Sequence, residues 1–73
     1  MSIFSERLKQ SRLESGLTQK QVCDKTELKL RQLGRYENAE QEPTISKVIN
    51  LADTLNISID YLAGRTDDPK LHK

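Results

Sequence analysis

A single cysteine, Cys23, is the feature that most limits how this chain of 73 residues can fold. One cysteine permits neither an internal disulfide nor a thiolate-based zinc cluster, the usual devices that stabilise very small domains. A chain this short buries only about 60 % of the surface that its unfolded form exposes. Close helix packing or self-association must therefore supply the stability. We expect one small domain, without a metal or a cofactor, and not an enzyme.

The apolar residues are too scattered for a membrane-spanning segment or a secretory signal. The longest uninterrupted apolar run has three residues, 61–63, whereas a spanning helix needs about 20. The sequence therefore predicts a cytoplasmic protein with no membrane contact.

The formal net charge of +1 conceals two unlike halves. Residues 1–37 hold eight basic and five acidic side chains, and residues 38–73 hold four and six. The stretch 25–35 has four basic side chains against Glu27 alone. The local sign of the charge decides what a surface attracts, so a basic surface is expected in the first half of the chain.

A first helix is predicted over residues 3–15, followed by a stop at Gly16. Three apolar side chains form an imperfect inward stripe along this helix: Phe4, Leu8 and Leu13. Glycine suits the left-handed conformation that ends many helices. The spacing therefore predicts a short helix that packs through only part of one face.

A second helix begins after Thr18 and ends near residue 25 or 26. Gln21 lies three residues after Thr18, and this spacing is that of a capping box. Val22 and Cys23 are the expected inward residues. A small side chain such as Cys23 suits a point where two helices cross closely.

A third helix is predicted over residues 29–36, with opposite faces of different chemistry. Leu28 and Leu33 anchor its underside. Its other face carries amide and cationic side chains: Lys29, Arg31, Gln32 and Arg35. Residues 38–42 follow as a polar loop.

The fourth helix has the clearest apolar pattern in the chain. Thr44 is its expected N-terminal cap, and Asn56 the expected left-handed stop. Its apolar residues recur at helical spacing and predict a core face: Ile45, Val48, Ile49, Ala52 and Leu55.

A short fifth helix is expected between Ser58 and Gly64, and the apolar signal is lost beyond it. We predict one domain over residues 1–64 and a disordered tail over residues 65–73. No alternation typical of β-strands occurs. The sequence therefore predicts an all-α fold, a compact five-helix bundle.

The third helix matches the major groove of DNA in size and chemistry. A helix with its side chains is about 10–12 Å across, and the major groove is about 12 Å wide. Arginine can donate two hydrogen bonds to guanine, and glutamine can pair with adenine. An ordinary solvated helix face would show the same spacing, so the residue types alone leave both interpretations open.

Three longer stretches resemble the Cro/phage-repressor helix-turn-helix domains, often called the Xre family. These stretches are RLKQSRLESGLTQKQV, LGRYENAEQEPT and VINLADTLNISIDYLAG, and together they extend over most of residues 4–64. The resemblance implies a lambda-repressor-like domain in which the second and third helices form the helix-turn-helix. It also implies a bacterial or phage-type transcriptional regulator, associated with the nucleoid and repressor-like in action. Dimers of such proteins read two half-sites about 34–36 Å apart on double-stranded DNA.

The resemblance assigns roles to individual residues of this chain. Gln19 and Asn38 would contact the DNA backbone, and Arg12 with Glu37 would form a structural salt bridge. The recognition helix over residues 29–36 would bring five side chains to the bases: Lys29, Leu30, Arg31, Gln32 and Arg35.

Several positions depart from the pattern of the family. Glu27 stands where relatives usually have a glycine in the turn, and Lys29 cannot cap the recognition helix as serine or threonine would. Gly34 lies inside that helix, and Ala39 replaces the usual glycine after the asparagine. These departures predict a slightly irregular recognition helix on an unchanged fold.

Two further expectations concern partners. A homodimer is expected to form through the fifth helix and the tail, with Ile59, Tyr61, Leu62 and Leu71 as candidate contacts. The alternative function is a protein-interaction module, such as an antirepressor, an adaptor or an antitoxin partner. It would keep the same fold with weak DNA affinity, and the near-neutral charge favours it modestly.

Overall fold

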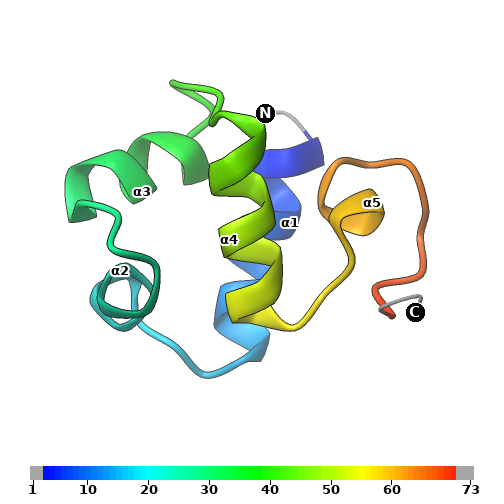
Figure 1. Ribbon diagram of the computed structural model, residues 1–73, viewed down its shortest axis with the longest axis horizontal. Helices are drawn as coiled ribbons and strands as arrows, with labels where there is room; N and C mark the ends of the chain where they lie inside the picture. The colour runs from blue at the N-terminus through cyan, green and yellow to red at the C-terminus, as the bar shows by residue number, and fades with distance from the viewer. Residues whose placement is uncertain (1–2, 71–73) are drawn as a thin grey trace.

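The computed structural model describes residues 3–70, and this part of the chain folds into five α-helices without a strand. They are α1 (Ile3–Glu14), α2 (Gln19–Thr26), α3 (Leu30–Glu37), α4 (Ile45–Leu55) and α5 (Ile59–Leu62). In Figure 1, α1 and α4 lie in the middle, α2 and α3 at one end, and α5 at the other. The predicted all-α, five-helix architecture is confirmed. Within residues 3–70 no helix combines the length and the apolar character that crossing a membrane requires.

Hydrogen bonds between near neighbours in the sequence set most helix ends. The Thr18 side chain accepts from the Gln21 backbone N–H, and the Gln21 side chain accepts from the Thr18 N–H, which completes the capping box. Gly16 and Asn56 adopt the predicted left-handed conformation, with φ of 71° and 57°. Ser58 caps α5 by accepting from the Tyr61 N–H. These ends follow from local chemistry and agree with the sequence prediction.

Thr44 differs from its predicted role as a side-chain cap. It occupies the N-cap position of α4 in an extended conformation, but its side chain makes no capping hydrogen bond. Its hydroxyl lies 3.1 Å from the Ser46 hydroxyl instead. The first turn of α4 is therefore held by backbone contacts and packing.

The core is a single cluster to which all five helices contribute. Leu8, Leu33 and Leu51 are completely buried, and Tyr36 is 1 % exposed. The Phe4 ring packs edge-on against the Tyr36 ring at 6.5 Å between centroids. Tyr36 is thus a packing residue whose side chain is too deeply buried to reach the surface.

The predicted inward stripe of α1 is wrong at Leu13, which is 58 % exposed. At 3.6 residues per turn, Leu13 lies about 180° around the helix from Phe4, on the far side from the core. Ser5, Ser11 and Arg12 are buried on the inward side instead. The core-facing side of α1 is therefore partly polar, which explains why its apolar pattern is weak.

The predicted core face of α4 is also shifted. Ile45 and Ile49 are 68 % and 40 % exposed, whereas Leu51, which the pattern left out, is fully buried. The buried arc is centred between Leu51 and Ala52, so the two isoleucines lie at its edge. The two isoleucines therefore lie outside the core.

The segment 65–70 forms no helix, but it is bonded to the rest of the protein. The Arg7 guanidinium donates to the carbonyls of Tyr61 and Thr66 and to the Asp67 carboxylate. The same guanidinium lies over the Tyr61 ring, 4.1 Å from its centroid. The Ser58 N–H donates to the Pro69 carbonyl at 2.9 Å. These long-range contacts were not part of the sequence prediction of a disordered tail.

Candidate nucleic-acid interface

The two faces of α3 differ as the sequence predicts. Leu33 is fully buried on its underside, and Leu28, just before the helix, is 9 % exposed. On the outer side Lys29, Arg31 and Arg35 are exposed and Gln32 is half-buried. The helix therefore presents hydrogen-bond donors to solvent while its apolar side holds it to the domain.

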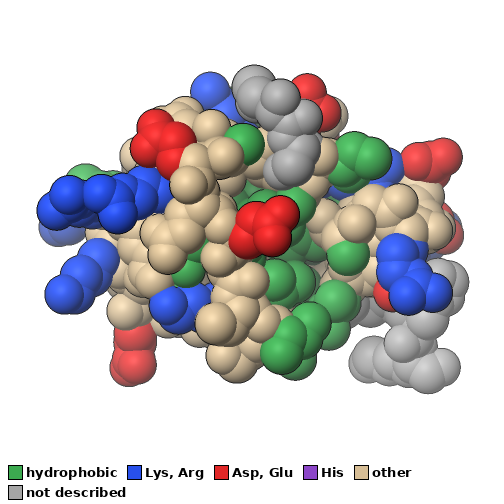
Figure 2. All heavy atoms as spheres, turned by 90° about the horizontal axis from the view of Figure 1, so that it is seen from above, with side chains coloured by type: hydrophobic (Ala, Val, Ile, Leu, Met, Phe, Trp, Pro, Cys, Tyr) green, Lys and Arg blue, Asp and Glu red, His purple; other side chains and the backbone are tan. Residues whose placement is uncertain are grey.

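The outer side chains of α3 line a shallow hollow together with Gln41 from the following loop. Its other lining residues are Lys29, Arg31, Gln32 and Arg35. Figure 2 shows Lys and Arg side chains gathered at the end of the molecule where α3 lies. Gln41 was not among the site residues predicted from the sequence. It comes close to α3 because the left-handed turn at Ala39, with φ of 59°, directs the chain back past the helix.

Leu30 is the apolar member of the predicted base-contacting set. Its side chain is 53 % exposed at the first residue of α3 and does not belong to the core. An exposed leucine beside arginines is suited to contact with the methyl group of thymine. The five predicted base-contacting residues therefore combine cationic, amide and apolar groups on consecutive turns.

The turn between α2 and α3 accommodates its unusual residues. Glu27 adopts the left-handed conformation, with φ of 63°, and its N–H donates to the Cys23 carbonyl at 2.8 Å. Lys29 is the N-cap of α3 and makes no side-chain capping bond. Two side-chain hydrogen bonds hold the end of α2, just before this turn. The Thr26 hydroxyl donates to the Val22 carbonyl, and the Asn50 amide donates to the Thr26 carbonyl.

The Cys23 thiol lies within the α2 part of the core at 8 % exposure. Burial raises the pKa of this thiol, and the nearby charges of Asp24 and Glu37 raise it further. A thiol with a raised pKa is a poor nucleophile and a poor metal ligand. Cys23 is therefore a small packing residue, and residues 3–70 contain no cluster of side chains that could hold a metal ion.

Arg12 and Glu37 form a buried ion pair beneath the end of α3. The Arg12 Nε donates to Glu37 Oε2 at 2.7 Å, and its Nη2 donates to Oε1 at 3.1 Å. The Gln19 amide donates to the same Oε1 at 3.1 Å. Arg12 also donates to the Leu17 carbonyl at 3.0 Å. This network joins α1, the start of α2 and the last residue of α3.

The two residues predicted to contact the DNA backbone lie at helix ends. Asn38 is exposed at the C-terminal end of α3, where its N–H donates to the Gly34 carbonyl. Gln19 is half-buried at the first residue of α2, and its amide is engaged by Glu37. The structure thus places both beside the α3 surface, with Gln19 oriented by the ion pair.

The predicted dimer contacts are separated by the fold. Leu62 is completely buried, so this residue belongs to the core and was wrongly predicted as an exposed contact. Tyr61 is half-buried beneath Arg7, and Ile59 is 36 % exposed. Leu71 lies outside the described residues. Of the described three, Ile59 offers the most accessible apolar side chain.

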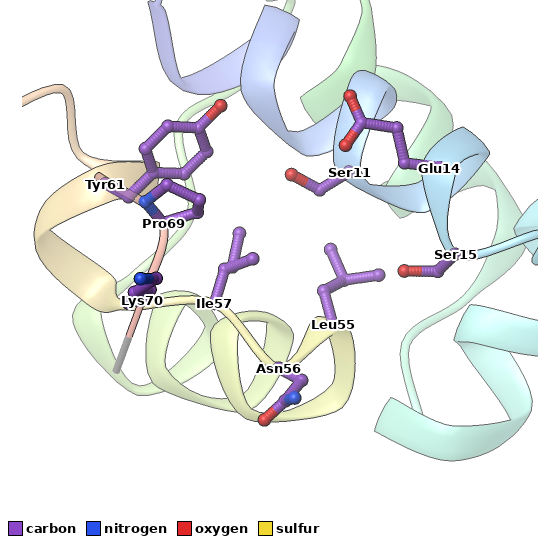
Figure 3. Close-up of a pocket in the computed structure, with 9 residues that line it drawn as sticks. All are labelled: Ser11, Glu14, Ser15, Leu55, Asn56, Ile57, Tyr61, Pro69 and Lys70. Carbon is purple, nitrogen blue, oxygen red and sulfur yellow. The ribbon is translucent and has the colours of Figure 1, made fainter. Parts of the chain in front are cut away.

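A second hollow lies on another side of the domain, between the ends of α1 and α4 and residues 69–70. Figure 3 shows Ser11, Glu14 and Tyr61 facing Leu55 and Ile57 across it. Its volume is about 350 Å³. The lining mixes hydroxyl, carboxylate and aliphatic groups and has no basic cluster like that of α3. Among the described surfaces, the outer side of α3 therefore suits a polyanion better.

Known proteins resemble this chain in sequence and in fold. The helix-turn-helix family profile matches residues 8–62. The uncharacterized HTH-type transcriptional regulator YobD of Bacillus subtilis is 34 % identical over 92 % of this chain and 60 % of its own length. The cryptic phage CTXphi transcriptional repressor RstR of Vibrio cholerae is 40 % identical over 85 % of this chain and 55 % of its own length. Both are named as transcriptional regulators, not as enzymes, in agreement with the sequence prediction.

A solved structure extends the comparison to the fold. The P22 c2 repressor protein, in complex with synthetic operator 9T, superposes with a TM-score of 0.83 at 21 % identity, over 90 % of this chain and 100 % of that one. The chain spans only 53 to 60 % of the length of the first curated relatives that it matches. The profile match and these likenesses show that this chain belongs to the helix-turn-helix family, of the Cro/phage-repressor type.

Proposed function

We propose that this protein is a sequence-specific DNA-binding transcriptional regulator, with a repressor-like action, in the cytoplasm and nucleoid of a bacterial cell. The observation that carries the proposal is the outer side of α3. Its cationic and amide side chains converge on one hollow, while its underside is anchored in the core. The names of the relatives support the same conclusion.

In this proposal α3, with residues 29–36 as the recognition segment, enters the major groove. Arg31 and Arg35 donate to guanine, and Gln32 pairs with adenine. Lys29 and Leu30 complete the base-contacting set. Gln19 and Asn38 bind phosphates of the DNA backbone. At Gln19, the first residue of α2, the positive end of the helix dipole favours an anion.

We add one residue, Gln41, to this proposed interface. Gln41 lines the same hollow as the arginines and extends the contact beyond the end of α3. The Arg12–Glu37 pair supports the helix from below, because Glu37 is its last residue. We propose that this pair positions the recognition helix and does not itself contact DNA.

We further propose that the helix-turn-helix domain comprises residues 1–64, and that two copies bind an operator with two half-sites about 34–36 Å apart. Residues 65–73 form a C-terminal tail, whose described part is attached through Arg7. A dimer doubles the number of base contacts, which matters in a protein whose net charge is only +1. Non-specific attraction to DNA is modest at that charge.

The test begins with selection of a binding site from random duplexes. Arg31→Ala and Arg35→Ala should each weaken binding to that site by about 1–3 kcal/mol and relax the base preference at one position. Arg65→Ala is the matched control, because Arg65 lies far along the chain at an exposed position and should leave binding unchanged. Unaltered affinity and base preference in both α3 variants would refute the base-reading role.

The alternative is an interaction module of the antirepressor, adaptor or antitoxin-partner kind. The near-neutral charge and the uncapped start of α3 favour it. The salt dependence of DNA binding separates the two functions, since each neutralised phosphate contributes a slope of about −0.9. A slope near zero would support the interaction module.

A further inference from the structure

The two ends of α3 are supported in different ways. The Arg12–Glu37 ion pair fixes its C-terminal end. At its start, Lys29 occupies the N-cap position and makes no side-chain hydrogen bond. The helices that pack closely against α3 are α1 and α2, and α4 packs against α2. The direction in which α3 begins is therefore set by the turn that joins it to α2.

One peptide group of this turn, between Thr26 and Glu27, is hydrogen-bonded at both of its polar atoms. Its N–H belongs to Glu27 and donates to the Cys23 carbonyl at 2.8 Å. Its carbonyl belongs to Thr26 and accepts from the Asn50 side-chain amide, also at 2.8 Å. A peptide group is planar, so the two bonds together fix the orientation of this plane. One of the two comes from α4, 24 residues away in the sequence.

The Thr26 side chain connects the same peptide group to both helices of the helix-turn-helix. Thr26 is 4 % exposed, and its hydroxyl donates to the Val22 carbonyl within α2 at 2.8 Å. The same hydroxyl accepts from the Leu28 N–H at 3.4 Å. Leu28 belongs to the core and anchors the underside of α3. The Asn50 bond therefore acts on the residue at which α2 and the start of α3 are linked.

The backbone of Glu27 makes an external bond at this place more valuable. Glu27 has a φ of 63°, in a region that glycine adopts freely and other residues adopt only at a cost. Its conformation is held by the bonds of the peptide group that precedes it. Asn50 supplies the bond that comes from outside the helix-turn-helix.

We propose that Asn50 is a positioning residue for the recognition helix. From α4 it holds the Thr26–Glu27 peptide group and so sets the angle at which α3 leaves α2. Asn50 does not line the hollow beside α3, so it acts without contact to the bases. This role rests on the proposed function, because it concerns how α3 is presented to DNA. Substitution of Asn50 should change base reading in a protein that stays folded.

The first experiment uses the free protein, so its outcome does not depend on DNA. Asn50→Leu keeps the size and branching of the side chain, adds no charge and removes the amide donor. Asn50→Ala is the second variant, since alanine favours a helix more than asparagine does and should keep α4 intact. In both, amide hydrogen exchange at the Glu27 N–H should become about tenfold faster, because the turn opens more often. The NMR signal of the Arg12 Nε–H, which reports the ion pair, should stay in place. An unchanged exchange rate at Glu27 in both variants would overturn the inference.

The second experiment measures DNA binding at a temperature at which circular dichroism shows every variant to be folded. Both Asn50 variants should bind the selected operator about tenfold more weakly, an effect the size of one lost base contact. Their base preference should relax at the positions that α3 reads. Thr54→Ala is the matched control, because Thr54 is also a half-buried polar residue, one turn further along α4. It should leave affinity and base preference unchanged. A merely structural role of Asn50 would lower stability without altering the base preference of the folded protein.

A double-mutant cycle tests whether Asn50 acts through the turn. Glycine at position 27 adopts the left-handed conformation without help. Asn50→Leu should therefore weaken DNA binding less in the Glu27→Gly background than in the original one. An equal loss in both backgrounds would show that Asn50 does not act through this turn.

The outcomes separate this inference from the proposed function. Operator binding with the same affinity and base preference in both Asn50 variants would overturn the inference while the proposed function stands. An equal loss of affinity in Thr54→Ala would also overturn it, since the effect would not be specific to the turn. Failure of the wild-type protein to bind any selected duplex would instead refute the proposed function, and with it the role of Asn50 in base reading.

Discussion

The two helices of the helix-turn-helix have the same length and are held in different ways. Both α2 and α3 have eight residues. The start of α2 has a complete capping box, made by Thr18 and Gln21. The start of α3 has Lys29, which makes no side-chain capping bond, and Gly34 lies within the helix. Local hydrogen bonds therefore stabilise α2 much more than α3.

Long-range contacts, and not local hydrogen bonds, fix the position of α3. Leu33 and Tyr36 are fully or nearly fully buried, and Glu37 bonds to Arg12, which is 25 residues away in the sequence. The position of α2 is thus specified by its own residues, and that of α3 by the rest of the domain. The outer side chains of α3, including Lys29, thus remain available to a ligand.

The largest expected effect is at the long-range anchor of α3. Glu37→Ala would leave the Arg12 guanidinium buried without its carboxylate partner. We expect the free energy of unfolding to fall by about 3–5 kcal/mol, the usual result of breaking a buried ion pair. Urea unfolding followed by circular dichroism measures it. Glu40→Ala, at an exposed position in the next loop, is the control; equal losses in the two variants would contradict the anchoring role.

The comparison of the two helix starts can be tested directly. Thr18→Ala removes the cap of α2 and should lower the free energy of unfolding by about 1 kcal/mol. Lys29→Ala removes no cap and should change it by less than about 0.5 kcal/mol. Lys29→Ser, which adds a capping hydroxyl, should raise stability. Equal effects of the two alanine substitutions in thermal unfolding would remove the distinction between the helices.

Gly34 offers a way to strengthen the local contribution to α3. A Cβ at this position would meet no atom within 4 Å, so Gly34→Ala should stabilise the domain by about 0.8–1 kcal/mol. Gly64→Ala should do the opposite, because Gly64 has a φ of 86° and a Cβ there would lie 3.0 Å from the Ile3 side chain. Denaturant midpoints of both variants provide the measurement. Destabilisation by Gly34→Ala would indicate that α3 needs an adaptable backbone.

The smallest expected effect concerns the buried thiol of α2. Burial raises the pKa of Cys23 in the folded protein, so folding favours the neutral thiol. The stability gained from keeping this thiol neutral is fully present below about pH 8.5, the pKa of a free thiol. It is lost as the pH rises through the higher pKa that the Cys23 thiol has in the folded protein. Cys23→Ala should therefore reduce the loss of stability between neutral and alkaline pH. An identical pH profile for both proteins would contradict this account.

The sequence predicted the elements whose cause is local. The helix ends at Gly16, Asn56 and Ser58 follow from bonds and dihedral preferences within a few residues. The two faces of α3 were also predictable, because Leu33 and the cationic residues alternate at helical spacing. The pairing of Arg12 with Glu37 came from a family resemblance and not from their spacing.

Other features depend on partners far along the chain. Leu13 and Ile45 look like core residues in the sequence but are exposed, since burial depends on which side of a helix its neighbours cover. Gln41 lies beside α3 because the loop after this helix folds back along it. Arg7 bonds to residues 66 and 67 because the C-terminal segment packs against α1. No local pattern marks these contacts.

The helix boundaries of this protein, and the residues on the outer side of α3, could be read from the sequence without knowledge of the fold. Hydrogen bonds and side-chain periodicity act over three or four residues, so they can be recognised without a fold. Three features became visible only in the folded domain: Leu62 is buried, Gln19 bonds to Glu37, and Ile3, Ile45 and Ile59 meet in one groove. The physical reason is that burial and long-range contact belong to the packed arrangement of all five helices and to no single segment.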